Sequence, residues 1–103
     1  MHGEIMTAIE QLHVIVKGRV QGVSFRYYTR QQAFRLGISG WIRNNADGTV
    51  EVLAQGTREH LEELLDFLHV GSPSARVTDI DVEWSPATEP LDRFSIRYPT
   101  ATQ

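Results

Sequence analysis

Hydrophobic positions recur with two different periods in the first patterned part of the chain. Leu12, Val14 and Val16 alternate with other residues, which is the period of a β-strand that buries one face. From residue 25 onward the period lengthens to that of a helix, and Gly37 is well placed to end it. The residues of the helical stripe are Phe25, Thr29, Ala33 and Leu36. The pattern therefore predicts a strand, a short loop over 18–24 and a helix.

A turn sequence divides the next region, residues 38–56, into two β-like segments. Asp47 and Gly48 lie between them, and an Asp-Gly pair flanked by strand-like residues favours a hairpin, because glycine accepts a positive φ. We therefore expect two antiparallel neighbouring strands. Thr57 is the expected N-cap of a second helix. The apolar stripe of that helix is Leu61, Leu64, Leu65 and Leu68.

Strand-like alternation returns over 80–84 and again, more briefly, over 94–98. The order of elements is therefore βαββαβ, with the last segment as an additional short strand. Two right-handed βαβ crossovers joined by a hairpin place both helices on one face of an antiparallel sheet, which is the α+β class and the ferredoxin-like α/β sandwich. In this topology Asn44, at the end of the second strand, faces the loop over 18–24. Many activities occur on this fold, so it does not by itself define the chemistry.

Length and composition narrow the classes of function. The 103 residues suit a single domain over 1–103, with 1–11 as an unpatterned lead-in. A net charge of -3 argues against nucleic acid as a partner, because binding an extended phosphate backbone draws on a strong positive field. No apolar run approaches the length of a membrane span. We therefore expect a cytoplasmic monomer that binds neither nucleic acid nor a membrane.

The side chains that usually hold metals give no sign of a metal site. Cysteine is absent, which excludes disulfides, thiolate zinc sites and a cysteine nucleophile. The acidic residues that alternate over 79–83 are typical of the solvated face of a strand. No pair of histidines has ligand-like spacing with a third ligand nearby; they are His2, His13, His60 and His69. We therefore expect no metal.

The loop over 18–24 has the features of a binding site for a small anion. Gly18 and Gly22 allow the backbone to bend so that successive N–H groups point inward, and the first N–H groups of the following helix lack partners. Arg26, in the first helical turn, would add a planar donor group suited to phosphate. Ser24 is the expected N-cap. A nucleoside triphosphate is not expected, because the Gly-Lys-Ser/Thr ending of a nucleotide-binding loop is absent.

Longer segments carry a resemblance to a known family. The segment GRVQGVSFR over 18–26, followed by GWIRNNADGTVE over 40–51, closely resembles the two signature segments of the acylphosphatase family. GSPSARV over 71–77 and FSIRY over 94–98 are also similar to that family. The resemblance implies the α/β sandwich fold and hydrolysis of the carboxyl–phosphate bond of a small acyl phosphate to a carboxylate and inorganic phosphate. It implies no metal and no other cofactor.

The resemblance also implies roles for particular residues. Arg26 is the phosphate-binding catalytic arginine, and Asn44 holds the attacking water. The pair Asn45-Ala46 departs from the threonine and variable residue that often follow the asparagine in the family, which bears on the rate rather than on these two roles. The backbone N–H groups that bind the phosphoryl group belong to Arg19, Val20, Gln21, Gly22 and Val23.

Two other classes of function stay open. The same loop would serve a non-catalytic regulatory module that only binds phosphate or another anion. The chain would also suit a relative that handles carbamoyl phosphate, because acylphosphatase-like domains begin larger maturation proteins. Nothing in the sequence specifies an acyl pocket, so acetyl, carbamoyl, bisphosphoglycerate and aspartyl phosphates all stay open as substrates.

Overall fold

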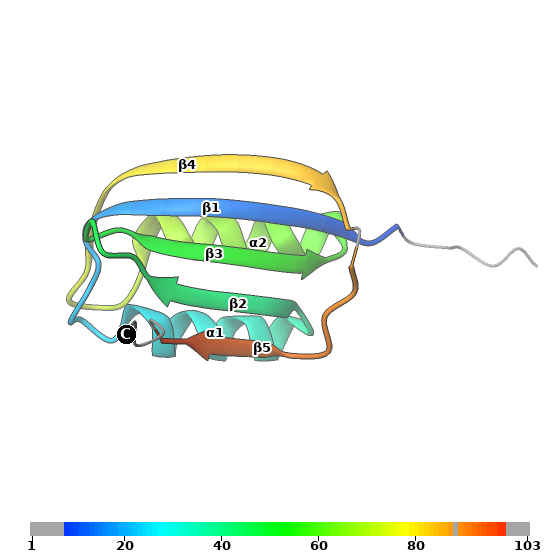
Figure 1. Cartoon of the computed structure of the whole chain (residues 1–103), viewed down its shortest axis with the longest axis horizontal. Helices are drawn as coiled ribbons and strands as arrows, with labels where there is room; N and C mark the ends of the chain where they lie inside the picture. Colours follow the sequence, from blue (N-terminus) through cyan, green and yellow to red (C-terminus); the bar gives the residue numbers. More distant parts are fainter. Residues whose placement is uncertain (1–7, 88, 99–103) are drawn as a thin grey trace, which may run out of the picture.

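The structure, a computed structural model, describes residues 8–87 and 89–98. Both helices lie on one face of a single sheet, as Figure 1 shows, and four strands alternate with them in the expected βαββαβ order. The α+β ferredoxin-like sandwich is therefore confirmed. The elements are β1 (Glu10–Arg19), α1 (Phe25–Leu36), β2 (Ser39–Asn44), β3 (Val50–Gly56), α2 (Arg58–Val70), β4 (Arg76–Pro86) and β5 (Phe94–Arg97).

The sheet has the strand order β4-β1-β3-β2-β5. The first four strands pair antiparallel, as expected, and the short segment near the end of the chain forms β5, which pairs parallel with β2 and makes the sheet mixed. Both β1 and β2 are antiparallel to β3, so they run in the same direction. The loop after β1 and the last residue of β2 therefore lie at the same end of the sheet.

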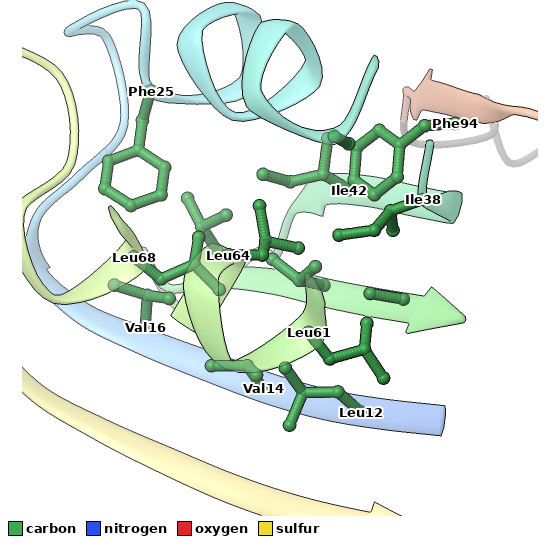
Figure 2. Packing of buried hydrophobic residues seen from close by; sticks show 14 of the residues in the cluster. Leu12, Val14, Val16, Phe25, Ile38, Ile42, Leu61, Leu64, Leu68 and Phe94 are labelled. Carbon is green, nitrogen blue, oxygen red and sulfur yellow. The ribbon is translucent and has the colours of Figure 1, made fainter. Parts of the chain in front are cut away.

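The core lies between the sheet and the two helices, where the expected apolar stripes meet (Figure 2). Burying each of its large side chains contributes about 1.5–3 kcal/mol relative to leaving it in water. Leu65, which was expected on the same stripe, is half-buried and packs against the edge of this core. The stripe residues with no exposed surface include Leu12, Val14, Val16, Leu61, Leu64 and Leu68.

The two expected N-caps differ. Thr57 caps α2, because its side chain accepts a hydrogen bond from the backbone N–H of His60 at 3.2 Å. Ser24 occupies the predicted N-cap position of α1, but its φ of 61° is left-handed and its side chain makes no capping hydrogen bond. Gly37 ends α1 as expected, with a left-handed φ of 69°.

The first strand is longer than its alternation indicated. Glu10 and Gln11, expected in the lead-in, already pair with β3 on one side and β4 on the other. Two partner strands extend β1 beyond the stretch that its own side chains mark. The remainder of the expected lead-in up to residue 7 lies outside the described residues.

Candidate active site

The loop that joins β1 to α1 and the end of β2 enclose a hollow of about 430 Å³. Val20, Gly22 and Ser24 line it from the loop, Arg26 from the first turn of α1, and Asn44 from the end of β2. The topology thus brings Arg26 and Asn44 together, as expected from the parallel course of β1 and β2.

The backbone of the loop has the geometry of an anion cradle. Gly22 has a φ of 74° and Ser24 a φ of 61°, whereas Gln21 and Val23 do not have positive φ. Alternation of backbone handedness turns successive N–H groups toward one side and makes a concave site for an anion. Ser24 is the only non-glycine residue with positive φ in the described part of the chain, and such strain is typical of functional sites.

The N–H groups of this loop are available. No hydrogen bond among residues 8–87 and 89–98 uses a backbone N–H of residues 20–24 as its donor. The following turn of α1 adds the N–H groups that a helix leaves without partners at its start, together with the positive end of its dipole. The combined donors suit the oxygens of a phosphoryl group.

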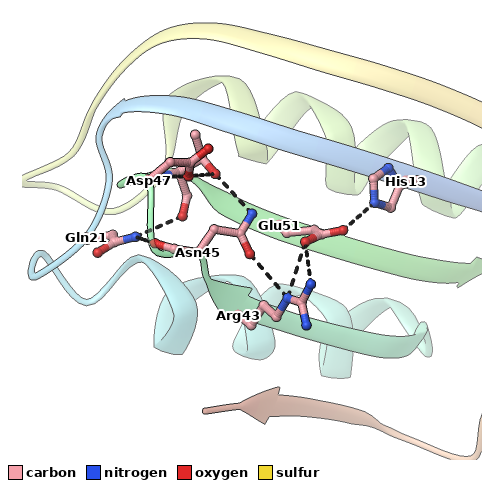
Figure 3. A network of polar contacts seen from close by, with 7 residues as sticks. His13, Gln21, Arg43, Asn45, Asp47 and Glu51 are labelled. Atoms are coloured by element: carbon pink, nitrogen blue, oxygen red, sulfur yellow. Dashed lines mark hydrogen bonds and ion pairs between the residues drawn. The ribbon is translucent and has the colours of Figure 1, made fainter. Parts of the chain in front are cut away.

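Three contacts fix the loop in this conformation. The side chain of Val20 is buried in the core, with 1% of its surface exposed. Gln21 Nε2 donates to the backbone oxygens of Asn45 at 2.8 Å and Thr49 at 2.9 Å, which ties the loop to the β2–β3 hairpin (Figure 3). Ser72 Oγ donates to the backbone oxygen of Val23 at 2.6 Å. The loop is therefore held before any ligand arrives.

Two glycines serve packing rather than the cradle. Gly18 lies at a bulge between β1 and β4, where a side chain would collide with the backbone of Arg76. This position explains its φ of 124°, and only Gly22 of the two expected glycines belongs to the cradle itself. Gly71 lies against the ring of Phe25, where a side chain would collide. It lets the connection after α2 approach the start of α1.

Arg26 is half-buried in the first turn of α1. Its guanidinium carbon lies 5.0 Å from the centre of the Tyr98 ring, a distance suited to a cation–π contact. No carboxylate in the described part of the chain lies within 4.0 Å of the Arg26 guanidinium. The aromatic ring therefore orients the guanidinium without neutralising its charge.

Asn44, the last residue of β2, carries an unsatisfied acceptor. Its Oδ1 is buried and has no hydrogen-bond partner among the described residues. A buried acceptor without a partner costs about 1–3 kcal/mol, so such atoms are rare unless a ligand or water satisfies them. Asn44 lines the hollow, and an amide oxygen without a partner is suited to accept a hydrogen bond from a water molecule.

The carboxylates of the neighbouring hairpin are engaged in structural contacts (Figure 3). His13 Nε2 lies 2.6 Å from Glu51 Oε2, and Arg43 Nη2 donates to Glu51 Oε1 at 3.0 Å. Burial raises the pKa of the Glu51 carboxyl, but the hydrogen bonds from His13 and Arg43 outweigh it and hold that pKa below its usual value. The Thr49 hydroxyl and N–H lower the pKa of Asp47 in the same way.

Positive charge gathers at the site although the chain is acidic overall. A second hollow shares Arg26 and Asn44 with the first and is also lined by Arg43 and Arg97. These two residues lie opposite each other on β2 and β5, and both guanidinium groups stack near the Trp41 ring, at 5.3 and 4.9 Å. Neither hollow is lined by His, Asp or Glu. The local charge favours an anion and supplies no carboxylate or imidazole base.

The five residues of the expected cradle do not all line the same hollow. Val20 and Gly22 line the first hollow, and Gln21 lines the second. Arg19 is the exposed last residue of β1, paired with Arg76, and lines neither. Val23 lines neither hollow, although its backbone is anchored by a hydrogen bond.

Sequence reasoning missed three side chains at this site. Ser72 and Tyr98 lie in two of the segments that resemble the family, but no role was assigned to either. Gln21 was expected to act through its backbone, whereas its side chain links the loop to the hairpin. The GSPSARV segment was the signal that pointed to Ser72, and the FSIRY segment was the signal that pointed to Tyr98.

The described residues form neither a metal site nor a membrane-spanning helix. Among residues 8–87 and 89–98, no three His, Asp or Glu side chains come together as a metal site would require. Within the same ranges, neither helix has the length and apolar character needed to cross a membrane.

Comparison with known proteins places these features in a family. The sequence model described as Acylphosphatase matches residues 12–96. The acylphosphatase of Pelotomaculum thermopropionicum is 48% identical over 86 residues, which are 84% of this chain and 94% of that protein. The crystal structure of the acylphosphatase of Bacillus subtilis has a TM-score of 0.84 at 44% identity and covers 86% of this chain and 99% of its own. An acylphosphatase from Coxiella burnetii reaches 0.82 at 36% identity, over 87% of this chain and 94% of its own.

The match spans the elements that build the site. It begins within β1 and ends within β5, so it includes the cradle loop, Arg26 and Asn44. The relatives also cover most of this chain and are themselves covered almost completely. The chain therefore belongs to the acylphosphatase family.

Proposed function

We propose that the protein hydrolyses the carboxyl–phosphate bond of a small acyl phosphate without a metal ion or other cofactor. One observation carries this proposal: three kinds of group converge on one hollow. They are the backbone N–H groups of Val20, Gly22 and Ser24, which donate no hydrogen bond among the described residues, the guanidinium of Arg26, and the side chain of Asn44, whose buried Oδ1 has no partner among those residues. The first two suit phosphoryl oxygens, and the third suits water.

The cradle and Arg26 bind the phosphoryl group and stabilise the transition state. Phosphoryl transfer passes through a loose state with negative charge on the equatorial oxygens, so catalysis depends mainly on positioning and on fixed positive charge. The amides are fixed by the anchors of Gln21 and Ser72. Arg26 supplies a full charge with no carboxylate partner among the described residues to weaken it.

Asn44 orients the nucleophile. Its Oδ1 accepts a hydrogen bond from a water molecule, which leaves a lone pair of the water oxygen directed at phosphorus. An amide side chain does this without taking the proton, as the glutamine of a GTPase does.

The reaction needs neither a general acid nor a base from the protein. As the water oxygen bonds to phosphorus, the bond from phosphorus to the acyl oxygen breaks and its electron pair leaves with the carboxylate. The pKa of a carboxylic acid is about 4, so the leaving group departs unprotonated. The proton of the water passes to a phosphate oxygen. This route agrees with hollows that no His, Asp or Glu lines.

A regulatory module that only binds an anion is less well supported. The cradle and Arg26 would serve both functions equally. Such a module would have no use for a buried, unpaired acceptor at Asn44, because an acceptor repels a phosphate oxygen. The Asn44 oxygen therefore favours hydrolysis.

Benzoyl phosphate hydrolysis in the presence of a chelator tests the proposal. We expect turnover by the native chain, loss of that turnover in Arg26→Ala, and a pH profile without a protein group of apparent pKa about 6–7. A folded native chain that binds inorganic phosphate but does not hydrolyse the substrate would favour the anion-binding module instead. A bell-shaped profile in that pH range would contradict proton transfer to phosphate.

We propose further that the protein acts as a cytoplasmic monomer on a small molecule rather than on nucleic acid. The net charge of -3 supports the exclusion of nucleic acid. Light scattering of the purified chain measures its mass and tests the monomer directly.

A further inference from the structure

A larger hollow, of about 860 Å³, lies beside the candidate active site along α1. Its lining comes from α1, from the turn that follows it, from Ser39 at the start of β2, and from the segment that enters β5, which contributes Asp92 and Arg93. The buried side chains of Ile38 and Phe94 contribute to it, while Phe34 stands at it with 86% of its surface exposed. The hydrolysis proposed above uses none of these three residues.

This hollow adjoins the phosphoryl site, because Tyr27 and Arg30 line both. The Tyr27 hydroxyl accepts a hydrogen bond from Gln31 Nε2 at 3.0 Å, which orients its ring. The Arg30 guanidinium lies 6.0 Å from that ring and has no carboxylate within 4.0 Å in the described part of the chain. An unneutralised cation therefore lies at the junction of the two hollows.

Two exposed aromatic residues follow the hollow away from this junction. Tyr27 is 48% exposed, and Phe34 follows it by two helical turns on the same face of α1. Single exposed apolar residues are normal on a protein surface. Two of them in line at a hollow that adjoins a candidate phosphoryl site indicate a ligand with an apolar body.

The chemistry of the reaction indicates on which side of phosphorus the acyl group of the substrate lies. The attacking and leaving oxygens lie roughly in line on opposite sides of phosphorus. Asn44 holds the water, so the acyl oxygen departs on the side of phosphorus away from Asn44. Tyr27 and Arg30 of α1 line the hollow that Asn44 also lines, and both residues line the hollow along α1 as well.

We propose that the hollow along α1 is the acyl subsite, and that the protein prefers acyl phosphates whose acyl group is extended and aromatic. Arg30 faces the leaving carboxylate, Tyr27 contacts the ring next to it, and Phe34 contacts the far end. The distance from Tyr27 to Phe34 along the helix is roughly 10 Å, so only a long acyl group reaches Phe34. This inference rests on the proposed function.

Three substrates of increasing length test it: acetyl phosphate, benzoyl phosphate and biphenyl-4-carbonyl phosphate. The variant is Phe34→Ala, which removes an exposed side chain and favours the helix, so the protein stays folded. We expect kcat/KM for the biphenyl substrate to fall about two- to tenfold, the usual effect of losing one aromatic contact. The value for acetyl phosphate is expected to stay within about twofold, because its acyl group is too short to reach Phe34.

Val82→Ala is the matched control, because it shortens another exposed apolar residue on β4, at the opposite edge of the sheet. It is expected to leave all three substrates unchanged. An equal loss for all substrates in Phe34→Ala, or no loss for the biphenyl substrate, would overturn the acyl subsite. Failure of the underlying hydrolysis is separate, since the native chain would then not hydrolyse even acetyl phosphate.

Discussion

Helices α1 and α2 lie on the same face of the sheet, and each has an arginine in its first turn near an aromatic ring at the edge of the sheet. Arg26 lies 5.0 Å from the Tyr98 ring, and Arg58 lies 3.7 Å from the Trp84 ring. The surroundings of the two arginines then differ. Arg58 contacts two carboxylates, at 2.9 and 3.3 Å, whereas Arg26 contacts none among the described residues.

The first turns of the two helices also differ in whether the chain itself satisfies their backbone N–H groups and their positive charge. Thr57 satisfies one N–H group of α2, and an acidic residue, Glu59, lies in its first turn. At α1, Ser24 is left-handed, makes no capping bond, and no acidic residue lies in the first turn. The start of α2 is thus neutralised from within the chain, whereas the start of α1 keeps its donors and its charge. Local rules of helix stability are therefore broken at the candidate site, as is typical of functional sites.

The largest expected effect separates the two arginines. Arg26→Ala is expected to lower kcat for benzoyl phosphate by about 10³-fold or more, because a positive charge on the transferring phosphoryl group is lost. The stability of this variant is expected to be close to that of the native chain, since the Arg26 side chain is only half-buried and has no ion pair among the described residues. Initial rates and urea denaturation measure both quantities.

Arg58→Ala provides the matched control. It removes the pairs with Glu10 and Glu62, so a modest loss of stability is expected with unchanged turnover. The hydrogen bond with Glu10 raises the pKa of Arg58, a side chain that is charged at neutral pH in any case. Loss of activity in both variants would mean that the difference between the two helix starts has no bearing on catalysis.

Asn44→Ala is expected to lower kcat by about a hundredfold, the usual effect of removing one positioned polar group at a reacting centre. Inhibition by inorganic phosphate is expected to stay nearly unchanged, because the cradle and Arg26 are intact. Stability is expected to hold or rise, since the variant removes a buried acceptor that has no partner among the described residues. Weaker phosphate inhibition would assign Asn44 to phosphate binding instead of water.

The contrast between the two helices also explains what the sequence predicted well. The stripe of α2 and its Thr57 cap are local patterns, and the structure confirms both. The cap predicted at Ser24 relied on the same local rule; its position is right, but the backbone of that residue is left-handed and its side chain makes no capping bond. The local rule for the capping bond thus fails at the residue that adjoins the candidate site.

Contacts between distant residues were beyond the reach of pattern reasoning. The Ser72–Val23 bond joins positions 49 apart, and the Gln21–Thr49 bond joins positions 28 apart. The pairing of β5 with β2 likewise has no local signal for its parallel direction. The sequence placed Arg26 and Asn44 at one end of the sheet only because the topology fixes which strand ends meet.

Two glutamines test whether the anchoring of the cradle matters for activity. Gln21 bridges loops at the site, whereas Gln55 holds Gln11, Glu89 and Leu91 at the other end of β3. Gln21→Ala is expected to lower kcat/KM about tenfold, because a displaced cradle aligns the phosphoryl group poorly. Each lost hydrogen bond also costs about 0.5–1.5 kcal/mol of stability.

Gln55→Ala is the control for a structural bridge of the same residue type. The Gln55 side chain is nearly fully buried. Gln55→Ala is therefore expected to lose at least as much stability as Gln21→Ala, with kcat/KM unchanged. If the two variants lost activity in proportion to stability, the bridge at Gln21 would be a packing contact like any other.

The smallest expected effect compares the two helix caps directly. Thr57→Ala is expected to lower the free energy of unfolding by about 1 kcal/mol, because the bond to the His60 N–H is lost. Ser24→Ala is expected to change the free energy of unfolding by only a few tenths of the effect of Thr57→Ala, since no capping hydrogen bond is removed. Ser24→Gly is expected to raise it by roughly 0.5 kcal/mol, because relief of a left-handed backbone, worth about 1–2 kcal/mol, exceeds the added freedom of the unfolded chain.

Urea denaturation and initial rates of the three variants decide between two explanations of the uncapped α1. If Ser24→Gly stabilises the protein and lowers kcat, the left-handed serine is strain that holds the cradle in its binding conformation. If it stabilises the protein without any change in kcat, the cradle is fixed by Val20, Gln21 and Ser72 alone. Equal losses in Ser24→Ala and Thr57→Ala would show that the two helix starts are capped alike, and would remove the physical contrast on which the anion site at α1 depends.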